Sequence, residues 1–410
     1  MVGAGPVIRA MAAHIGLVDT MDRAVSWDTD RCRLSPGERI LALLVNRLTE
    51  REPLYRVQEA FALTDPALLL GHGMTARDLG DDALGRALDK LAPAGVAAVF
   101  SAVAARAYTV EGIRPTGMHF DTTSRSLYGA YPTADGTAGV APRYGHSQDH
   151  RADLQQMVFT WFVHRDGVPL MGTVEDGHRS DKRLNREQID RIVAAFRPEA
   201  LQDLVYIAAS ALVTGPNRDA VAAAGIARLS RLPDPFGVAA TAKAAAWDAA
   251  AWIPVGRVAQ RPTAAAYWAS EQTGRMGDRE YRLVVYRSSS RDPRQAQSLD
   301  RELAQIRADA DWAAADLAAH DFACAADAAA TAAWRAQAPR WWGCQTTVHA
   351  VTLTEKRRRP GRPRREAIPP SRTVYRVQVT WGPQVTWGPR DEAAVQAELQ
   401  RRSPFVLMTN

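Results

Sequence analysis

Asp121 is the residue of this sequence whose type and position most directly suggest chemistry. It stands at the centre of the run Met118-His119-Phe120-Asp121-Thr122-Thr123-Ser124, whose β-branched and aromatic residues are typical of a strand. A carboxylate within a buried strand costs several kcal/mol unless it is paired, hydrogen-bonded or bound to a metal ion. Asp121 is therefore either a metal ligand or a hydrogen-bonded strand acid without a functional role.

The segments after Asp121 predict the elements that would position it. Residues 154–164 are apolar and β-rich, and Asp166-Gly167 is a typical hairpin turn before a third strand over residues 168–174. Helix, strand, helix and strand are then predicted over residues 185–196, 204–208, 217–224 and 226–229. This is the order of a ribonuclease H-like core, in which acids from the middle of strand one and the end of strand four converge on two magnesium ions.

Seven short motifs resemble those of the DDE transposases of bacterial insertion sequences, in particular the insertion sequence four superfamily. The resemblance covers residues 5–410 and keeps the order and spacing of the motifs. It implies metal-dependent DNA cleavage and strand transfer at terminal repeats, with Mg²⁺ as cofactor and Asp121 as a catalytic metal ligand. It implies double-stranded DNA as partner and allows a homodimer. The motifs are Ser35-Pro36-Gly37-Glu38, Pro53-Leu54-Tyr55-Arg56-Val57, Leu84-Gly85-Arg86-Ala87-Leu88-Asp89-Lys90, Phe120-Asp121-Thr122-Thr123-Ser124, Tyr144-Gly145-His146-Ser147, Asp149-His150-Arg151 and Ala209-Ser210-Ala211-Leu212.

Two departures from the family pattern predict that this chain is catalytically inactive. The place of the family's second Asp is occupied by Ala209, and the family's Glu lies on a helix beyond a strand that resembles residues 405–410, where this sequence stops. Two-metal strand transfer needs carboxylates that hold both ions about 3.5–4 Å apart. Asp203 is at the other end of the predicted strand and is a poor substitute. Asp219 begins the next helix and is nearer, but the sequence does not define the direction of its side chain.

The sequence predicts an α/β protein, with a ribonuclease H-like mixed sheet and flanking helices, preceded by an all-α domain and carrying a helical and β insertion. The capping box at Ser35-Pro36-Gly37-Glu38 marks a helix start in the first part. The resemblance implies recognition of the element's ends there, and Arg47, Arg51 and Arg56 are either phosphate contacts or a solvated helix face. The predicted divisions are the helical domain 1–110, the first part of the core 111–232, the insertion 233–402 and the start of another core strand 403–410.

A basic loop between two predicted strands is the main DNA-binding candidate. Its charge exceeds the whole chain's net +6, so the remainder is close to neutral. The run from Arg359 to Arg365 resembles an AT-hook, whose arginines enter a narrow A·T minor groove, although Pro360 replaces the usual arginine. Arg151 is a further candidate near the DNA backbone, and the alternative for the loop is a solvated segment without a partner. The loop candidates are Lys356, Arg357, Arg358, Arg359, Arg362, Arg364 and Arg365.

Other compositional features argue against secretion and structural metal. The three cysteines are far apart and odd in number, so neither a disulfide framework nor a zinc site is indicated. His146, Asp149 and His150 lack a fourth ligand at zinc spacing, which favours a connection to the second strand over a metal site. No apolar run is long enough to span a membrane and no signal peptide is evident, so a cytoplasmic location is expected.

The sequence thus leaves three hypotheses open. The first is an inactive version of an insertion-sequence transposase. The second is a DNA-binding regulator or competitor of transposition that derives from a truncated transposase. The third is a decayed copy without a role.

Overall fold

The computed structural model divides the chain into two compact units, which are described separately. The first comprises residues 1–231 together with 409–410, and the second comprises residues 232–408. The residues described are 3–71, 73–129, 131, 139–146, 149–336, 341–342, 344–354, 371–381 and 391–410.

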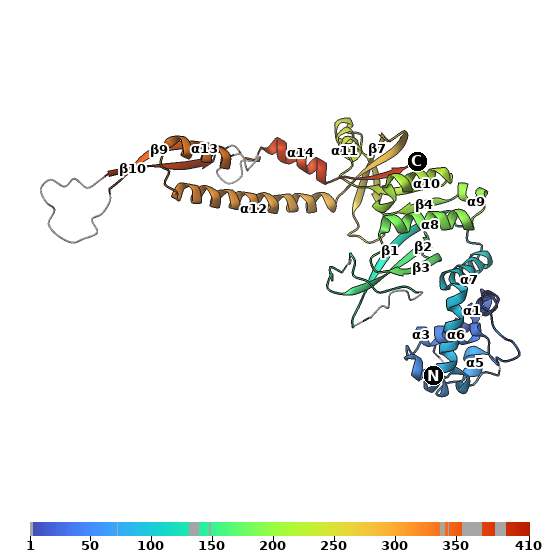
Figure 1. The fold of residues 1–410 in the computed structure, drawn as a ribbon. Helices are drawn as coiled ribbons and strands as arrows, with labels where there is room; N and C mark the ends of the chain where they lie inside the picture. The colour runs from blue at the N-terminus through green and yellow to red at the C-terminus, as the bar shows by residue number, and fades with distance from the viewer. Residues whose placement is uncertain are drawn as a thin grey trace, which may run out of the picture. The chain divides into compact units, whose positions relative to one another are not determined.

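The first unit begins with helices that pack around a core of their own (Figure 1). The predicted capping box is present, because Ser35 Oγ accepts from the Glu38 amide at 3.1 Å and Glu38 Oε2 accepts from the Ser35 amide at 2.7 Å. Leu41, Val45 and Phe61 are buried in this core. The helices are α1 (Gly5–His14), α2 (Leu17–Ala24), α3 (Pro36–Leu48), α4 (Val57–Ala62), α5 (Pro66–Leu70), α6 (Asp81–Ala94) and α7 (Val96–Val110).

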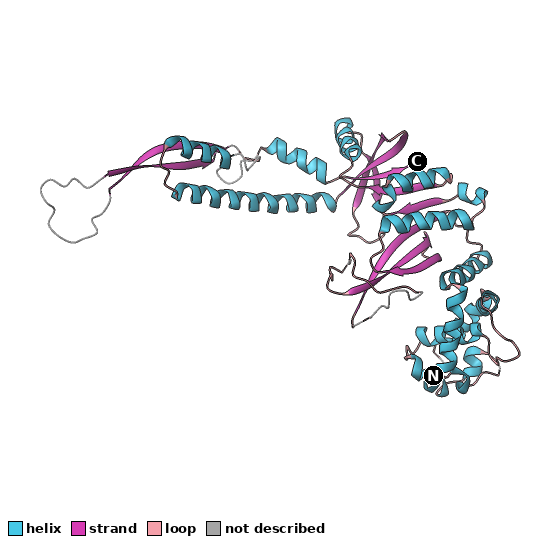
Figure 2. Cartoon of the chain, in the orientation of Figure 1, coloured by secondary structure: helices cyan, strands magenta, loops and turns pink. Residues whose placement is uncertain are grey.

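A mixed sheet follows, and the predicted α/β class is confirmed (Figures 1 and 2). Within the first unit its strand order is β3-β2-β1-β4-β5. The first three strands are antiparallel neighbours, whereas β4 pairs in parallel with both β1 and β5. The elements are β1 (Gly117–Leu127), β2 (Gln155–His164), β3 (Pro169–Asp176), α8 (Asp181–Ala195), α9 (Pro198–Gln202), β4 (Val205–Ala208), α10 (Gly215–Ala223) and β5 (Ala227–Leu232).

The two faces of this sheet differ sharply in burial. On one face Phe120, Phe162 and Tyr206 form a ring cluster, which is buried together with side chains of α8 and α10. The opposite face carries exposed residues, including Asp121 and Trp161. The alternation of strand side chains therefore leaves β1 with one core face and one open face.

The second unit contains further strands and a long helix. Within it the sheet order is β11-β8-β7-β6, and β9 and β10 form a separate antiparallel pair. The alanine-rich stretch over residues 299–336 is helical and is divided between α12 and α13. The elements are α11 (Gly237–Ala249), β6 (Ile253–Arg257), β7 (Ala266–Met276), β8 (Arg279–Ser288), α12 (Arg291–Ala319), α13 (Ala325–Ala336), β9 (Cys344–Thr354), β10 (Ser371–Trp381), α14 (Glu392–Arg402) and β11 (Phe405–Thr409).

The end of α14 is fixed by side-chain donors from α11 and α12. Trp247 Nε1 donates to the carbonyl of residue 400 at 3.0 Å, and Lys243 Nζ donates to that of residue 401 at 2.9 Å. Arg291 donates to the carbonyls of residues 402 and 403 at 3.3 and 2.8 Å. Four carbonyls that a helix end leaves without intrahelical partners are thus satisfied by side chains.

Asn410 lies beside β5 in the first unit. Its Oδ1 accepts from the amide of Arg228 at 2.7 Å, and its Nδ2 donates to the carbonyl of Ile226 at 3.2 Å. The side-chain amide therefore satisfies two backbone groups that flank Ala227, much as a neighbouring strand would.

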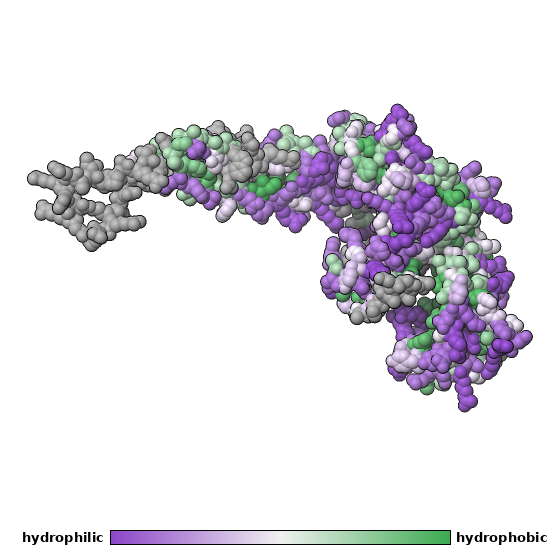
Figure 3. All heavy atoms as spheres, in the orientation of Figure 1, coloured by the Kyte–Doolittle hydropathy of each residue, from purple (hydrophilic) through white to green (hydrophobic). Residues whose placement is uncertain are grey.

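The visible surface is mostly hydrophilic (Figure 3). Among the described residues, no single helix has the length and apolar character needed to cross a membrane. One pair, α6 and α7, meets those criteria jointly but is bent by 90°.

Candidate functional site

Asp121 and Ala209 belong to one row across adjacent strands. In the parallel pairing of β1 with β4, Phe120 lies opposite Ala208, so the next residues along each strand are Asp121 and Ala209. Both are exposed on the open face of the sheet. Neighbouring strands are about 4.8 Å apart. The structure therefore places residue 121 mid-strand and residue 209 at the carboxyl end of the adjacent parallel strand, as the sequence predicts.

At Ala209 the backbone leaves β4 and enters a short 3-10 helix. Ala209 is extended and caps the short 3-10 helix Ser210–Val213. Its carbonyl accepts a hydrogen bond from Ser230 Oγ at 3.0 Å, and Ser230 is the β5 partner of Ala208. Arg231, the next β5 residue, continues the row and is exposed. Position 209 thus lies between a strand that carries a carboxylate and a strand that carries a guanidinium.

The environment of Asp121 corrects one premise of the sequence argument. Its carboxylate is exposed, and its Oδ1 accepts a hydrogen bond from the Thr122 amide at 2.9 Å. Water and this amide solvate the charge, so the large cost of a buried carboxylate does not arise. Mid-strand position alone is therefore weaker evidence for a metal ligand than the sequence suggested.

The described residues do not fit a two-ion magnesium site. None of them form a group of three or more His, Cys, Asp or Glu side chains that could hold a metal ion. Asp203 precedes β4 at its other end, and Asp219 lies on α10, whose Val221 is in the core on the opposite face. Ala209 has no side-chain oxygen, so Asp121 is the one carboxylate contributed by residues 121, 209 and 231.

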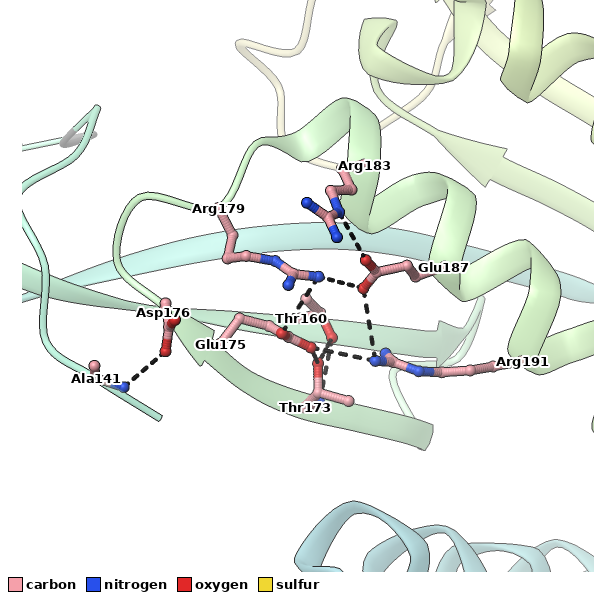
Figure 4. Close-up of polar contacts among 9 residues, drawn as sticks. All are labelled: Ala141, Thr160, Thr173, Glu175, Asp176, Arg179, Arg183, Glu187 and Arg191. Carbon is pink, nitrogen blue, oxygen red and sulfur yellow. Dashed lines mark hydrogen bonds and ion pairs between the residues drawn. The ribbon is translucent and has the colours of Figure 1, made fainter. Parts of the chain in front are cut away.

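An ion-pair network behind the sheet was missed by the sequence analysis (Figure 4). Glu175 of β3 is 3.3 Å from Arg191 and 3.8 Å from Arg179. Glu187 of α8 also pairs with Arg179, and with Arg183 at 3.2 Å. These contacts fix α8 against β3 and leave the carboxylates neutralised. The spacing of Arg183, Glu187 and Arg191, four residues apart, was the available signal.

Arg151, a predicted DNA contact, is paired within its own loop. Its guanidinium donates to both carboxylate oxygens of Asp153, at 2.8 and 2.6 Å, and lies 5.8 Å from the ring centre of Tyr128. The hydrogen bond to Asp153 raises the pKa of Arg151, and the same bond lowers the pKa of Asp153. Because the positive charge already has a carboxylate partner, contact with a phosphate would have to compete with Asp153.

The segment before Arg151 is joined to the start of β2. Arg143 and Gln156 exchange backbone hydrogen bonds of 3.1 and 2.9 Å, and Gln156 Nε2 donates to the carbonyl of Gly177 at 2.7 Å. Asp176 accepts from the amide of Ala141 at 2.7 Å (Figure 4). This placement agrees with the predicted connection to the second strand.

The remaining predicted DNA contacts are the basic loop and the arginines of the helical domain. The basic loop from Lys356 to Arg365 lies outside the described residues. Arg56 is 3.7 Å from Glu52 and 3.6 Å from Glu59, in a hollow of about 290 Å³. Its surroundings are therefore acidic, which is unfavourable for a phosphate.

Residues 2–105 match the family described as "Domain of unknown function (DUF4277)". No curated protein matches. One similar solved structure is "Crystal structure of a pre-cleavage Mos1 transpososome", with 8% identity and a TM-score of 0.19, covering 50% of this chain and 61% of that chain. Another is "Mos1 transposase paired-end complex with left transposon end", with 7% identity, a TM-score of 0.17 and coverages of 48% and 60%. This chain spans less than two thirds of either one.

Proposed function

We propose that this chain has the core of an insertion-sequence DDE transposase and binds double-stranded DNA at the element's terminal repeats without cutting it. The observation that carries the proposal is the row formed by Asp121 of β1 and Ala209, the residue that directly follows the adjacent parallel strand β4. The strand order β3-β2-β1-β4-β5 supports it, because that order is expected of a ribonuclease H-like core.

The proposed inactivity follows from the chemistry of position 209. Two-metal phosphoryl transfer requires oxygen ligands that bridge or flank two cations. Mg²⁺ is held by few protein carboxylates, so the loss of one removes a large part of its site. A methyl group at residue 209 supplies no ligand, and the adjacent Arg231 adds positive charge that opposes cation binding.

The test is a cleavage and joining assay on terminal-repeat duplexes with Mg²⁺ or Mn²⁺. We expect no metal-dependent product above that formed by an Asp121→Ala control. We expect Ala209→Asp to increase Mn²⁺ affinity, because it places a second carboxylate in the row. Robust Mg²⁺-dependent cleavage by the unaltered chain, abolished by Asp121→Ala, would show that another acid serves and that the inactivity is wrong.

The second candidate function is a DNA-binding regulator that competes with an active transposase. The density of basic residues between 356 and 365 favours it, because those charges can bind phosphates without catalysis. Titration of the chain into the cleavage reaction of an active transposase from the same element should lower the yield. Unchanged cleavage at concentrations that saturate the DNA would exclude competition.

A further inference from the structure

We propose that Thr122, Asp181, Asn185 and Tyr206 are positioning residues that hold residues 121 and 209 in one row. The inference rests on the proposed function, because it concerns the same site. It assigns a role to side chains on the face of the sheet opposite that site. The four residues come from β1, α8 and β4, so they connect the two strands through a helix.

Thr122 lies between two carboxylates on opposite faces of the sheet. Its amide donates to Asp121 Oδ1 at 2.9 Å, on the open face. Its hydroxyl donates to Asp181 Oδ1 at 2.8 Å, on the core side. The position of β1 at residue 121 is thereby tied to the first turn of α8.

The connection continues from α8 to β4. Asn185 Nδ2 donates to the carbonyl of Asp181 at 2.9 Å, and its Oδ1 accepts from the hydroxyl of Tyr206 at 3.2 Å. Tyr206 lies three residues before Ala209. Three hydrogen bonds thus join Thr122 of β1 to Tyr206 of β4 through Asp181 and Asn185.

Three of these residues are buried, so a hydrogen bond that they lose is not readily replaced by one to water. Thr122 is 8% exposed, Asn185 is 3% exposed and Tyr206 is fully buried between the rings of Phe120 and Phe162. Burial also raises the pKa of Tyr206 well above its usual value, so its hydroxyl stays a donor. A register shift would leave several of these buried groups without partners, which is costly.

The short pairing between β1 and β4 makes such a connection important. Only residues 117–120 of β1 pair with β4, and Asp121 and Ala209 lie just beyond the last pair. A four-residue parallel ladder limits movement at its end weakly, because fraying begins there. The side-chain connection joins Thr122, just beyond that end of the ladder, to Tyr206, which pairs with Met118 within it.

The experiment uses the full chain carrying Ala209→Asp and measures Mn²⁺ affinity by electron paramagnetic resonance. Thr122→Val removes the hydroxyl at nearly constant shape, Thr122→Ser keeps it, and Tyr206→Phe removes only the other hydroxyl. We expect Thr122→Val and Tyr206→Phe each to weaken Mn²⁺ binding about tenfold or more, as for supporting groups behind metal ligands. We expect Thr122→Ser to change the Mn²⁺ affinity less than threefold. The double variant Thr122→Val with Tyr206→Phe should lose less affinity than the product of the two single losses.

A second measurement, on the chain with alanine kept at 209, separates the two proposals. Amide exchange in β4 should rise about tenfold in Thr122→Val and Tyr206→Phe, but not in Thr122→Ser. Unchanged exchange together with unchanged Mn²⁺ affinity overturns the positioning role. If Ala209→Asp gains no Mn²⁺ affinity while exchange responds as expected, the proposed site fails and the positioning role stands.

Discussion

Glu398 illustrates at the residue scale how a buried carboxylate can stabilise this fold. It is 7% exposed, and hydrogen bonds from Arg401 and then Arg402 lower its pKa to about 2, against an ordinary value of 4.5. Arg402 also pairs with Glu302 of α12 at 2.6 Å. Because the folded pKa lies below the unfolded one, the ionised carboxylate stabilises the folded state above pH 4.5. This contribution is lost as the pH falls towards 2.

Glu398→Gln should therefore destabilise the protein in a pH-dependent manner. A shift of this size corresponds to at most about 3 kcal/mol, and the exposure of Arg401 reduces the expected loss to about 1–2 kcal/mol at pH 7. Urea unfolding at pH 7, 5 and 3 checks this, because the difference between the two proteins should shrink below pH 5. A difference that stays constant over this range would show that packing, not charge, is what the substitution changes.

At the candidate site, residue types were predictable from the sequence but their environments were not. The strand around Asp121 follows from its β-branched neighbours, and Ala209 is identified by its motif. The exposure of Asp121 depends on which face of β1 the helices cover, which is decided by non-local packing. Likewise, the pairing of Thr122 with Asp181 joins residues 59 positions apart and has no local signature.

At the element scale, the end of α14 depends on a buried ammonium group. Lys243 is 3% exposed, pairs with Asp234 at 2.7 Å and donates to the carbonyl of residue 401. Burial lowers its pKa, while the hydrogen bond to Asp234 acts in the opposite direction. Both hydrogen-bond partners of the ammonium group are oxygen atoms.

Lys243→Met should cost about 2–4 kcal/mol, because it leaves a carboxylate and a carbonyl without their donor. The measurement is the free energy of unfolding in urea, with Arg294→Met on the exposed surface of α12 as control. The control should change stability by less than about 0.5 kcal/mol. Equal effects of both substitutions would mean that Lys243 does not fix α14.

Two glycines offer a matched test of close backbone approach. A Cβ at Gly177 would collide with the carbonyl oxygens of Gln156 and Arg143, both of them backbone atoms. A Cβ at Gly85, in α6, would meet nothing within 4 Å. Gly177→Ala should thus destabilise by more than about 2 kcal/mol, whereas Gly85→Ala should stabilise by up to about 1 kcal/mol. Thermal unfolding of both variants measures these changes in stability. A neutral effect of Gly177→Ala would contradict the close approach of the Gln156 and Arg143 carbonyls to Gly177.

The elements of the first sheet were more predictable than those of the second unit. Alternating burial and the Asp166-Gly167 turn give β1, β2 and β3 clear local patterns. In β6 all five residues are exposed, so no hydrophobic alternation marks it as a strand. β8 and β11 are neighbouring strands although more than 100 residues separate them in the sequence. Hydrophobic periodicity cannot reveal such a pairing.

At the scale of the whole molecule, the positive charge is strongly localised in the sequence. The basic loop carries more charge than the net +6 of the chain. We expect salt-dependent binding to duplex DNA, with about five phosphates neutralised and a log–log salt slope near −4 to −5. Fluorescence anisotropy over a range of salt concentrations measures this slope.

The double substitution Arg362→Ala and Arg364→Ala should reduce that slope by about two. It should weaken binding most on A·T-rich duplexes, because those arginines are expected to enter the minor groove. A substitution of Arg151, which is already paired with Asp153, serves as control and should change the slope by less than one. An unchanged slope in the double variant would move the DNA surface elsewhere, and absent binding at low salt would favour the decayed copy.

Because Asn410 is hydrogen-bonded to β5, the chain returns to the first unit close to the point where it left it. The polypeptide leaves the first unit after Arg231 and re-enters it at Thr409, and Asn410 lies beside Arg228. Leu232 is four positions beyond Arg228 on β5, about 13 Å along the strand. The 177 residues of the second unit are thus a cassette whose two ends are close enough for a linker of about six residues to replace it. Such exchangeability would let the length and content of this region change in evolution while the strands β3-β2-β1-β4-β5, one of which carries Asp121, kept their order.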